Sequence, residues 1–474
     1  MYTNSQFSSS RLWFPCLDNW HDRCTWEFDF VVDRTFEVVC SGEITQDRIS
    51  SDDSRKRCVS YRLNVLSAAP SIAFTVGKFA VHVNPNDTNI VSYCAPHKLR
   101  MVESCTNFVH KAYAFYEDYL GVSFPLESYK QVFLNISSPL ISKVSISILS
   151  AHLLHDETII EQALETRREL SRALALQWFG NFVYPKTAAD MWLLWGIAGH
   201  LASLFVSQLL GHNDFRHQLR KDADYVCQRD SGQPPLYYPE ALCPEEMDTE
   251  FVRRKAALVV YMIDRRLGSN MLAKVLNKLM TLASDGEFNL GLSTHYFLKL
   301  LKKISGKDFK IFADEWIYRS GCPKFYFAFA LNRKRNVVEL KFRQENSNVA
   351  ADWRFLGSMT IRIHESDGIF DHVVQIEEPT HAFEFPYHSK FRRARRMKKT
   401  RHASDDEPEW IELEDSLRID SPISWIRIDP DYDWAATVVL DQPDYMWSHQ
   451  LELDKDVIAQ CQVRLAAKIV LGRS

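Results

Sequence analysis

The sequence predicts a multi-domain α+β protein: a β-rich N-terminal domain, a mostly α domain, a β-sandwich and the start of a helical repeat domain. Three observations lead to this prediction. The chain has 474 residues, 46% of them hydrophobic, which exceeds one hydrophobic core and is enough to fill about two to four. Short β-rich runs broken by Asp, Ser, Gly and Pro occupy the two outer parts of the chain. Helical periodicity occupies the middle.

The first predicted domain covers residues 1–95. Apolar and polar residues alternate in the runs 26–32, 36–44 and 71–83, which is the pattern of half-buried strands. We therefore expect a β domain at this end of the chain.

The second predicted domain, residues 96–321, is mostly α. Apolar residues recur at helical spacing over 102–120, 157–179 and 190–211, and Gly211 follows as a predicted helix C-cap. The start of the second helix is predicted at Asp156 as N-cap, and the start of the third at a capping box over residues 187–190. Four large side chains are expected to pack these two helices together: Trp178, Phe179, Trp192 and Leu193.

Strands return in the third predicted domain, residues 322–440. Six runs have the spacing of a sandwich of short antiparallel strands, and residues 332–336 are predicted to turn a hairpin between the first two. An insertion at residues 388–418 has eight Lys or Arg in 390–402 and seven acids in 405–415, so we expect it to be solvated. Residues 441–474 are expected to begin a helical domain.

Charge, cysteine usage and hydropathy exclude some classes of protein. The net charge of −4 excludes a globally basic nucleic-acid binder, although it leaves room for local basic patches. The ten cysteines include no C-x-x-C pair, which favours reduced, buried thiols over a disulfide frame. We find no apolar run of the roughly 20 residues that cross a bilayer, so no membrane partner is expected.

The stretch QWFGNFV, residues 177–183, is followed by a Trp-x-x-x-Gly segment, residues 192–196. It resembles the gluzincin aminopeptidases, the family of aminopeptidase N, in which H-E-x-x-H-Q-W-F-G-N supplies two zinc ligands and the catalytic glutamate. The resemblance implies a thermolysin-like fold for the mostly α domain. It aligns Arg172 and Leu176 with the two histidines, Ala173 with the glutamate, and Trp195 with the third ligand.

None of these four side chains can perform the aligned role. Leucine and alanine have no donor atoms, the indole N–H of tryptophan only donates, and a guanidinium repels a divalent cation. We therefore expect no zinc and no other cofactor. A rebuilt metal site from His152, His155, Asp156 and His200 is the less favoured interpretation, because coordination requires several converging ligands.

Two further features of the family are missing. Its G-x-M-E-N loop, which binds the substrate amino group through the glutamate, would lie near residues 133–143, and no acid occurs between Glu127 and Asp156. The tyrosine that stabilises the oxyanion aligns with Arg253. The resemblance therefore implies a frame that has lost the substrate anchor and the oxyanion donor.

A second resemblance covers about residues 8 to 440. The segments 10–20 (SRLWFPCLDNW) and 116–129 resemble gluzincin aminopeptidases, while FAFALNRKRNVVELKF at 327–342 and SPISWIRIDPD at 421–431 are not typical of active ones. Together they resemble the aminopeptidase-like second subunits of the general transcription factor TFIID. Members of that family extend further at both ends, so we expect the β domain to be truncated at its start.

This resemblance implies a nuclear, non-enzymatic scaffold that takes part in core-promoter recognition and preinitiation-complex assembly. The implied partners are other TFIID subunits, including histone-fold TBP-associated factors and the largest TBP-associated subunit, together with core-promoter DNA. One alternative hypothesis is a divergent zinc aminopeptidase with relocated metal ligands. Another is a protein-only adaptor that never contacts DNA.

The candidate DNA-binding or nuclear-targeting residues form two basic groups: Arg333, Lys334 and Arg335 in the predicted hairpin, and Lys390, Arg392, Arg393, Arg395, Arg396, Lys398, Lys399 and Arg401 in the insertion. An ordinary solvated turn is the favoured explanation of the first group, and a nuclear-localisation signal or a disordered tail explains the second as well as DNA binding does. Arg167, Arg168 and Arg172 could form a further patch, but we expect them to pair with Glu161, Glu165 and Glu169 on the same helix.

Overall fold

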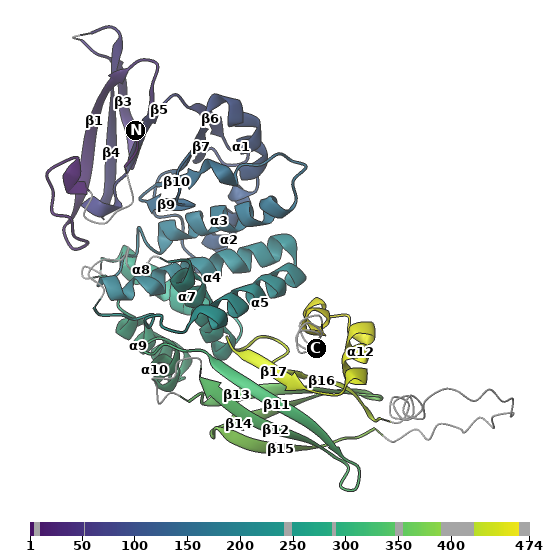
Figure 1. The fold of residues 1–474 in the computed structure, drawn as a ribbon. Coiled ribbons are helices and arrows are strands. Elements are labelled where there is room, and N and C mark those ends of the chain that lie inside the picture. Colours follow the sequence, from purple (N-terminus) through teal and green to yellow (C-terminus); the bar gives the residue numbers. More distant parts are fainter. Residues whose placement is uncertain are drawn as a thin grey trace. The chain divides into compact units, whose positions relative to one another are not determined.

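The structure is a computed structural model that describes residues 1–3, 10–51, 53–240, 249–286, 291–346, 354–389 and 421–463 (Figure 1). The chain forms two compact units. Unit 1 contains residues 1–215 and 234–319, and unit 2 contains residues 216–233 and 320–474. The order of a β-rich part, a mostly helical part and a β-sandwich confirms the multi-domain α+β fold class.

Unit 1 begins with two small antiparallel sheets. Their strands are β1 (Arg23–Asp33), β4 (Lys56–Ala68) and β3 (Glu43–Ile49) in that order, and the pair β2 (Glu37–Cys40) and β5 (Phe74–Gly77). On β1 the aromatic side chains Trp26, Phe28 and Phe30 alternate with acidic ones, and Phe28 and Phe30 pack against the buried residues Val38, Tyr61 and Phe74. The strict period of two puts these rings on one face of the strand, as the sequence predicts.

A five-stranded sheet follows in the order β6 (Ala80–Val83), β7 (Ile90–Cys94), β8 (Tyr129–Leu134), β10 (Ile146–Ser150) and β9 (Leu140–Lys143). The pairs β7–β8 and β8–β10 are parallel. Strands β8, β9 and β10 lie within the block predicted as mostly α, where no strand was predicted. They are only four to six residues long and nearly all buried, so they show neither alternation nor helical periodicity.

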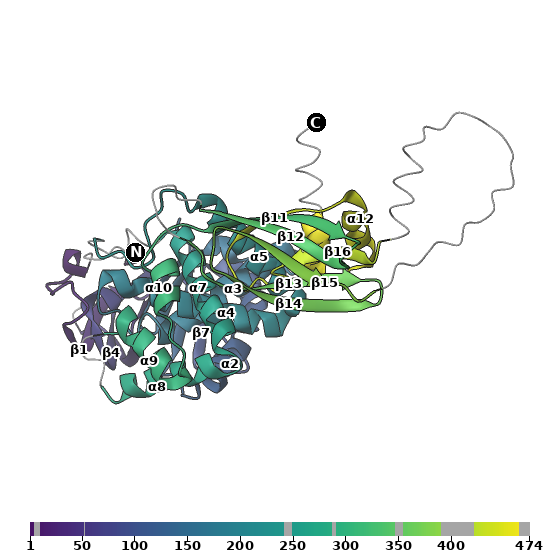
Figure 2. The ribbon, with the colours of Figure 1, turned by 90° about the horizontal axis from the view of Figure 1, so that it is seen from below.

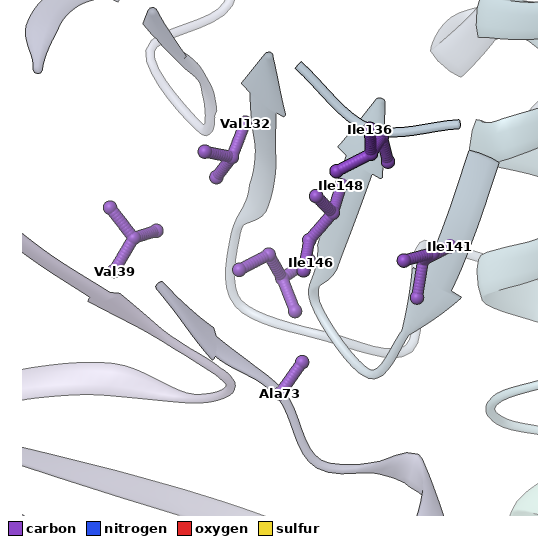
Figure 3. Close-up of a cluster of buried hydrophobic side chains, with 7 residues drawn as sticks. All are labelled: Val39, Ala73, Val132, Ile136, Ile141, Ile146 and Ile148. Carbon is purple, nitrogen blue, oxygen red and sulfur yellow. The ribbon is translucent and has the colours of Figure 1, made fainter. Parts of the chain in front are cut away.

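One apolar cluster joins this sheet to the preceding strands. Figure 3 shows its side chains converging from β8, β9 and β10 toward β2 and the residue before β5. The members are Val39, Ala73, Val132, Ile136, Ile141, Ile146 and Ile148. Because all seven are at most 7% exposed, the cluster forms a continuous core for this part of unit 1.

The described helices of unit 1 are α1 (Leu99–Thr106), α2 (Val109–Leu120), α3 (Glu161–Trp178), α4 (Met191–Leu210), α7 (Glu250–Leu267), α8 (Met271–Ser284), α9 (Thr294–Ser305) and α10 (Lys310–Trp316). Helices α1 to α4 fall in the runs that periodicity predicts, and α7 to α10 lie in the rest of the block predicted as mostly α. The predicted helix over 102–120 is in fact two helices, separated by Asn107 and Phe108. Helix α5 (His212–Arg229) runs on from unit 1 into unit 2.

The central helix α4 packs against α3 and α7. It has no side chain at Gly196, where a Cβ atom would lie 2.8 Å from the Ala256 carbonyl oxygen on α7. The prediction that no apolar run is long enough for a membrane is wrong for residues 188–210, a 23-residue helix whose most apolar 18-residue window has a mean hydropathy of 1.5. By length and composition alone this segment could cross a membrane, but 56% of its most apolar stretch is buried inside the protein, as in a core helix.

The predicted helix ends are partly correct. Gly211 ends α4 with φ of 96°, and its N–H donates to the Ser207 carbonyl, which confirms the C-cap. The Asp156 N-cap is wrong: its Oδ1 accepts from Thr158 in a turn, and α3 starts five residues later at Glu161. A side chain that folds back onto its own loop cannot reach the helix that follows.

The predicted capping box at 187–190 is wrong as well. Residues 188–190 form a 3-10 turn, and the Thr187 hydroxyl donates to Asp190 Oδ2 at 2.7 Å. Asp190 Oδ1 accepts from the Thr294 N–H at 2.7 Å. Asp190 is buried, and this bond fixes the start of α9. Because the two residues are about a hundred positions apart, no local sequence pattern reveals the contact.

Unit 2 contains the predicted sandwich (Figures 1 and 2). One sheet has the order β15 (Thr380–Pro386), β12 (Val337–Asn346), β11 (Pro323–Asn332) and β17 (Thr437–Asp441). The other has the order β14 (Gly368–Ile376), β13 (Gly357–Glu365) and β16 (Ile423–Ile428). Strand β15 lies outside the six runs predicted as strands. The prediction of antiparallel strands is wrong for β11 and β17, which pair in parallel.

The C-terminal part of the described chain is helical. Helix α12 (Asp444–Leu453) contacts β16, and residues 457–463 are helical again. Residues 390–420, which contain most of the predicted charged insertion, lie outside the described residues. No two cysteines in the described part of the chain form a disulfide.

Candidate functional site

The peptidase-like positions lie on the C-terminal half of α3 and on α4. Ala173 is completely buried and Leu176 is 8% exposed, while Trp195 is partly buried. The Arg172 side chain is 14% exposed, and its Nη2 donates to Glu169 Oε2 at 2.6 Å. Its Nε is buried and has no hydrogen-bond partner within the described structure. A permanent positive charge therefore occupies the position that the alignment assigns to a metal ligand.

The histidines considered for a rebuilt metal site have other surroundings. His152 is exposed, and His155 is buried with its Nδ1 at 2.9 Å from the Asp156 carbonyl oxygen. His200 is buried on α4, where its Nε2 lies 3.1 Å from Asp264 Oδ2 on α7. Over the ranges of the chain that the structure describes, no group of three or more His, Cys, Asp and Glu side chains is placed to hold a metal ion.

The positions aligned with the substrate anchor and the oxyanion donor contain no acidic residue. Arg253 is partly buried on α7, and Lys255 is buried two residues later with its Nζ 5.6 Å from the centre of the Phe251 ring. In the segment 133–143, Lys143 donates to the Pro70 carbonyl at 2.7 Å. Lys143, the charged residue of the segment aligned with the substrate anchor, would repel the amino group of a peptide and could not bind it.

The retained residues of QWFGN make structural contacts. Gln177 is completely buried; its Oε1 accepts from the Ser145 N–H at 2.9 Å, and its Nε2 donates to the hydroxyls of Ser142 and Ser147 at 3.1 and 3.4 Å. Asn181 Nδ2 donates to the same Ser142 hydroxyl at 2.9 Å. Ser145 has φ of 60°, a left-handed conformation that a non-glycine residue adopts at a cost. These bonds hold the end of α3 against β9 and β10.

The three arginines of α3 have three different environments. Arg172 pairs with Glu169 three residues earlier, as helical spacing predicts. The same prediction is wrong for Arg168, whose Nη2 contacts Asp214 Oδ2 at 2.7 Å on the following α5. Arg167 lines a pocket. Pairing along the helix therefore accounts for only one of the three.

The predicted hairpin lies between β11 and β12, with Arg333, Lys334 and Arg335 exposed at its turn. Arg335 forms two hydrogen bonds with the Glu384 carboxylate, at 2.7 and 2.6 Å. These bonds raise the pKa of Arg335, and the carboxylate offsets its charge. The eight basic candidates from Lys390 to Arg401 lie outside the described residues.

The segment WIRIDPD, residues 425–431, forms ion pairs and hydrogen bonds with other residues of unit 2. Arg427 is buried, with its Nη1 at 2.8 Å from Asp456 Oδ2 and 3.6 Å from Asp454 Oδ2. The Asp429 carboxylate accepts from the N–H groups of Asp433 and Trp434 at 2.9 and 3.0 Å. Buried polar groups require such partners, so this motif has a structural role of its own.

Comparison with known proteins assigns this architecture to a class. A family model described as the Peptidase family M1 domain matches residues 105–316, and one described as the TAF2 Ig-like domain matches residues 320–443. A crystal structure of Legionella pneumophila aminopeptidase A in complex with aspartic acid has a TM-score of 0.72 at 13% identity, over 93% of this chain and 48% of that one. The fold is therefore that of an M1 aminopeptidase-like protein with a β-sandwich appended.

Sequence similarity identifies the family to which the chain belongs within this fold class. Transcription initiation factor TFIID subunit 2 of Drosophila melanogaster is 33% identical over 98% of this chain, and that of Danio rerio is 33% identical over 97%. A probable aminopeptidase 2 of Sulfurisphaera tokodaii is 23% identical over 68% of this chain and 42% of its own length. The chain is an aminopeptidase-like relative of the TFIID subunit 2 proteins. It spans about two fifths, 41%, of the length of the two TFIID relatives.

Proposed function

We propose that this chain acts as part of a non-enzymatic scaffold subunit of TFIID in the nucleus, in core-promoter recognition and assembly of the RNA polymerase II preinitiation complex. The observation that carries this proposal is the similarity to TFIID subunit 2 proteins along 97–98% of the chain. A scaffold acts by presenting surfaces, so its fold can persist without catalytic residues.

Loss of peptidase chemistry is part of the proposal. It is supported by the side chains of Arg172, Ala173, Leu176 and Trp195, which offer no lone pair to zinc. We expect the purified chain to contain no stoichiometric zinc by elemental analysis and to hydrolyse no aminoacyl reporter substrate.

The same measurements test a relocated metal site. Chelator-sensitive hydrolysis that disappears in His152→Ala or His155→Ala would establish the divergent-peptidase alternative and refute the scaffold proposal. His97→Ala is the matched control, because His97 is an exposed histidine outside the proposed metal set.

Assembly with other proteins is the direct test of the scaffold role. The proposed partners are other TFIID subunits, including histone-fold TBP-associated factors and the largest TBP-associated subunit. We expect the tagged chain to recover these proteins from nuclear extract, identified by mass spectrometry. Recovery of none of them by the tagged full-length protein would contradict the proposal.

Contact with promoter DNA is proposed through the turn of the β11–β12 hairpin. Lys334 forms no ion pair with a described residue, whereas Arg335 is bound to Glu384. We expect Lys334→Gln to weaken promoter retention in a salt-dependent manner and to reduce crosslinks from the hairpin. Lys303→Gln, an exposed lysine on α9, is the control. Equal retention of promoter and non-promoter DNA, with no hairpin crosslinks, would favour the protein-only adaptor.

A further inference from the structure

A pocket of about 580 Å³ in unit 1 is lined by residues of α1, the start of α2, the loop before α3 and the first turns of α3. Its volume is within the range of sites that hold a small ligand or several side chains of a peptide. The lining side chains that bear on its chemistry are His110, Lys111, His155, Glu157, Ile159 and Arg167. None of them is among the peptidase-like positions of α3 and α4.

The charged side chains of this pocket favour an anionic ligand. Lys111 and Arg167 contribute two cations, and neither forms an ion pair with a residue in the described ranges. Glu157 is the single acid among the residues that line the pocket. The His110 Nδ1 is buried with no hydrogen-bond partner in the described structure.

Apolar side chains lie beside these cations. Ile159 lines the pocket and is 43% exposed, and its neighbour Ile160 is 77% exposed. Phe108 supplies an aromatic wall, held by stacking on Phe205 at 6.1 Å between ring centres. Ile159 in the lining and the exposed Ile160 next to it in the chain add apolar surface beside the cations, which a purely anionic ligand would leave partly uncovered.

We propose that this pocket binds a segment of another protein in which an acidic side chain lies next to a large apolar one. The acidic group pairs with Arg167 and Lys111, and the apolar group covers Ile159 and Ile160. A DNA duplex matches this site poorly, because its phosphates lie on a convex surface and gain nothing from the isoleucines. The proposal does not depend on assembly into TFIID, since binding is measured on the chain itself.

Fluorescence anisotropy tests the proposal with a fluorescein-labelled peptide of alternating aspartate and leucine and the full chain. We expect saturable binding that weakens about tenfold or more in Arg167→Glu, the scale of a lost charge-assisted hydrogen bond. Ile160→Ser should weaken it severalfold without any change of charge. Lys303→Glu, an equal charge reversal on α9 outside the pocket, should leave the affinity within about twofold of the wild type. Because Arg167 pairs with no described acid and Ile160 is exposed, both variants should unfold at the wild-type temperature.

Three results would overturn the proposal. Equal affinity of Arg167→Glu and the wild type would show that the peptide binds elsewhere. Equally tight binding of an aspartate–serine peptide would show that the isoleucines are not used. Full competition by inorganic phosphate or a DNA duplex at matched charge concentration would show a general anion site.

Discussion

Replacing Gln177 with leucine tests whether the peptidase-like stretch of α3 now serves stability alone. Leucine has a similar volume and good helix propensity, so the substitution removes hydrogen bonds while it retains packing. In the wild type the Gln177 amide is completely buried and bonds to the Ser145 N–H and to the Ser142 and Ser147 hydroxyls.

The size of the effect follows from what each partner loses. The Ser145 N–H would have no acceptor in a buried position, which costs about 1–3 kcal/mol. The two hydroxyls lose less, because Ser142 still accepts from Asn181 and Ser147 still accepts from the Tyr129 hydroxyl at 3.0 Å. Together we expect a loss of about 2–4 kcal/mol in the free energy of unfolding.

Urea unfolding followed by tryptophan fluorescence and far-UV circular dichroism measures this loss. Gln208→Leu is the matched control, because Gln208 is an exposed glutamine on α4. It should change the free energy of unfolding by less than about 0.5 kcal/mol. If Gln177→Leu is as stable as this control, the amide does not support the Ser145 turn and our explanation of the retained stretch is wrong.

Three further variants test other parts of the structure. Gly196→Ala should destabilise the protein by about 1–2 kcal/mol despite its better helix propensity, because the new methyl would meet the α7 backbone at 2.8 Å; a raised melting temperature would contradict this. Burial lowers the pKa of His364 to about 4 from its ordinary value of 6.5, so its contribution to stability is present above pH 6.5 and is lost as the pH falls toward 4. His364→Gln should flatten that acid-side loss in urea titrations at several pH values, and an unchanged slope would show that His364 does not titrate as described. Glu384→Gln removes the partner of Arg335 and should strengthen DNA retention about two- to threefold with a steeper salt dependence; no change would argue against hairpin contact.

Much of the fold was predictable because long periodic segments dominate it. The run at 190–211 gave α4 with its C-cap at Gly211, and the two strands around 332–336 gave the β11–β12 hairpin. Short buried strands were not predictable: β8, β9 and β10 have no alternating pattern, since both faces are covered. Helix starts at Asp156 and Thr187 were misassigned because their side chains found partners other than the following helix.

For the candidate site, the sequence alone determined what cannot happen at the aligned metal positions. Leu176 and Ala173 have no lone pairs in any fold, so residue identity decides that neither can bind zinc. Only the tertiary structure decided what the surrounding residues do instead. In the fold, Gln177 accepts a hydrogen bond from Ser145, Arg335 forms an ion pair with Glu384, and Arg167 lines a pocket. These outcomes depend on residues brought together from distant parts of the chain, and local propensities contain no information about such pairs.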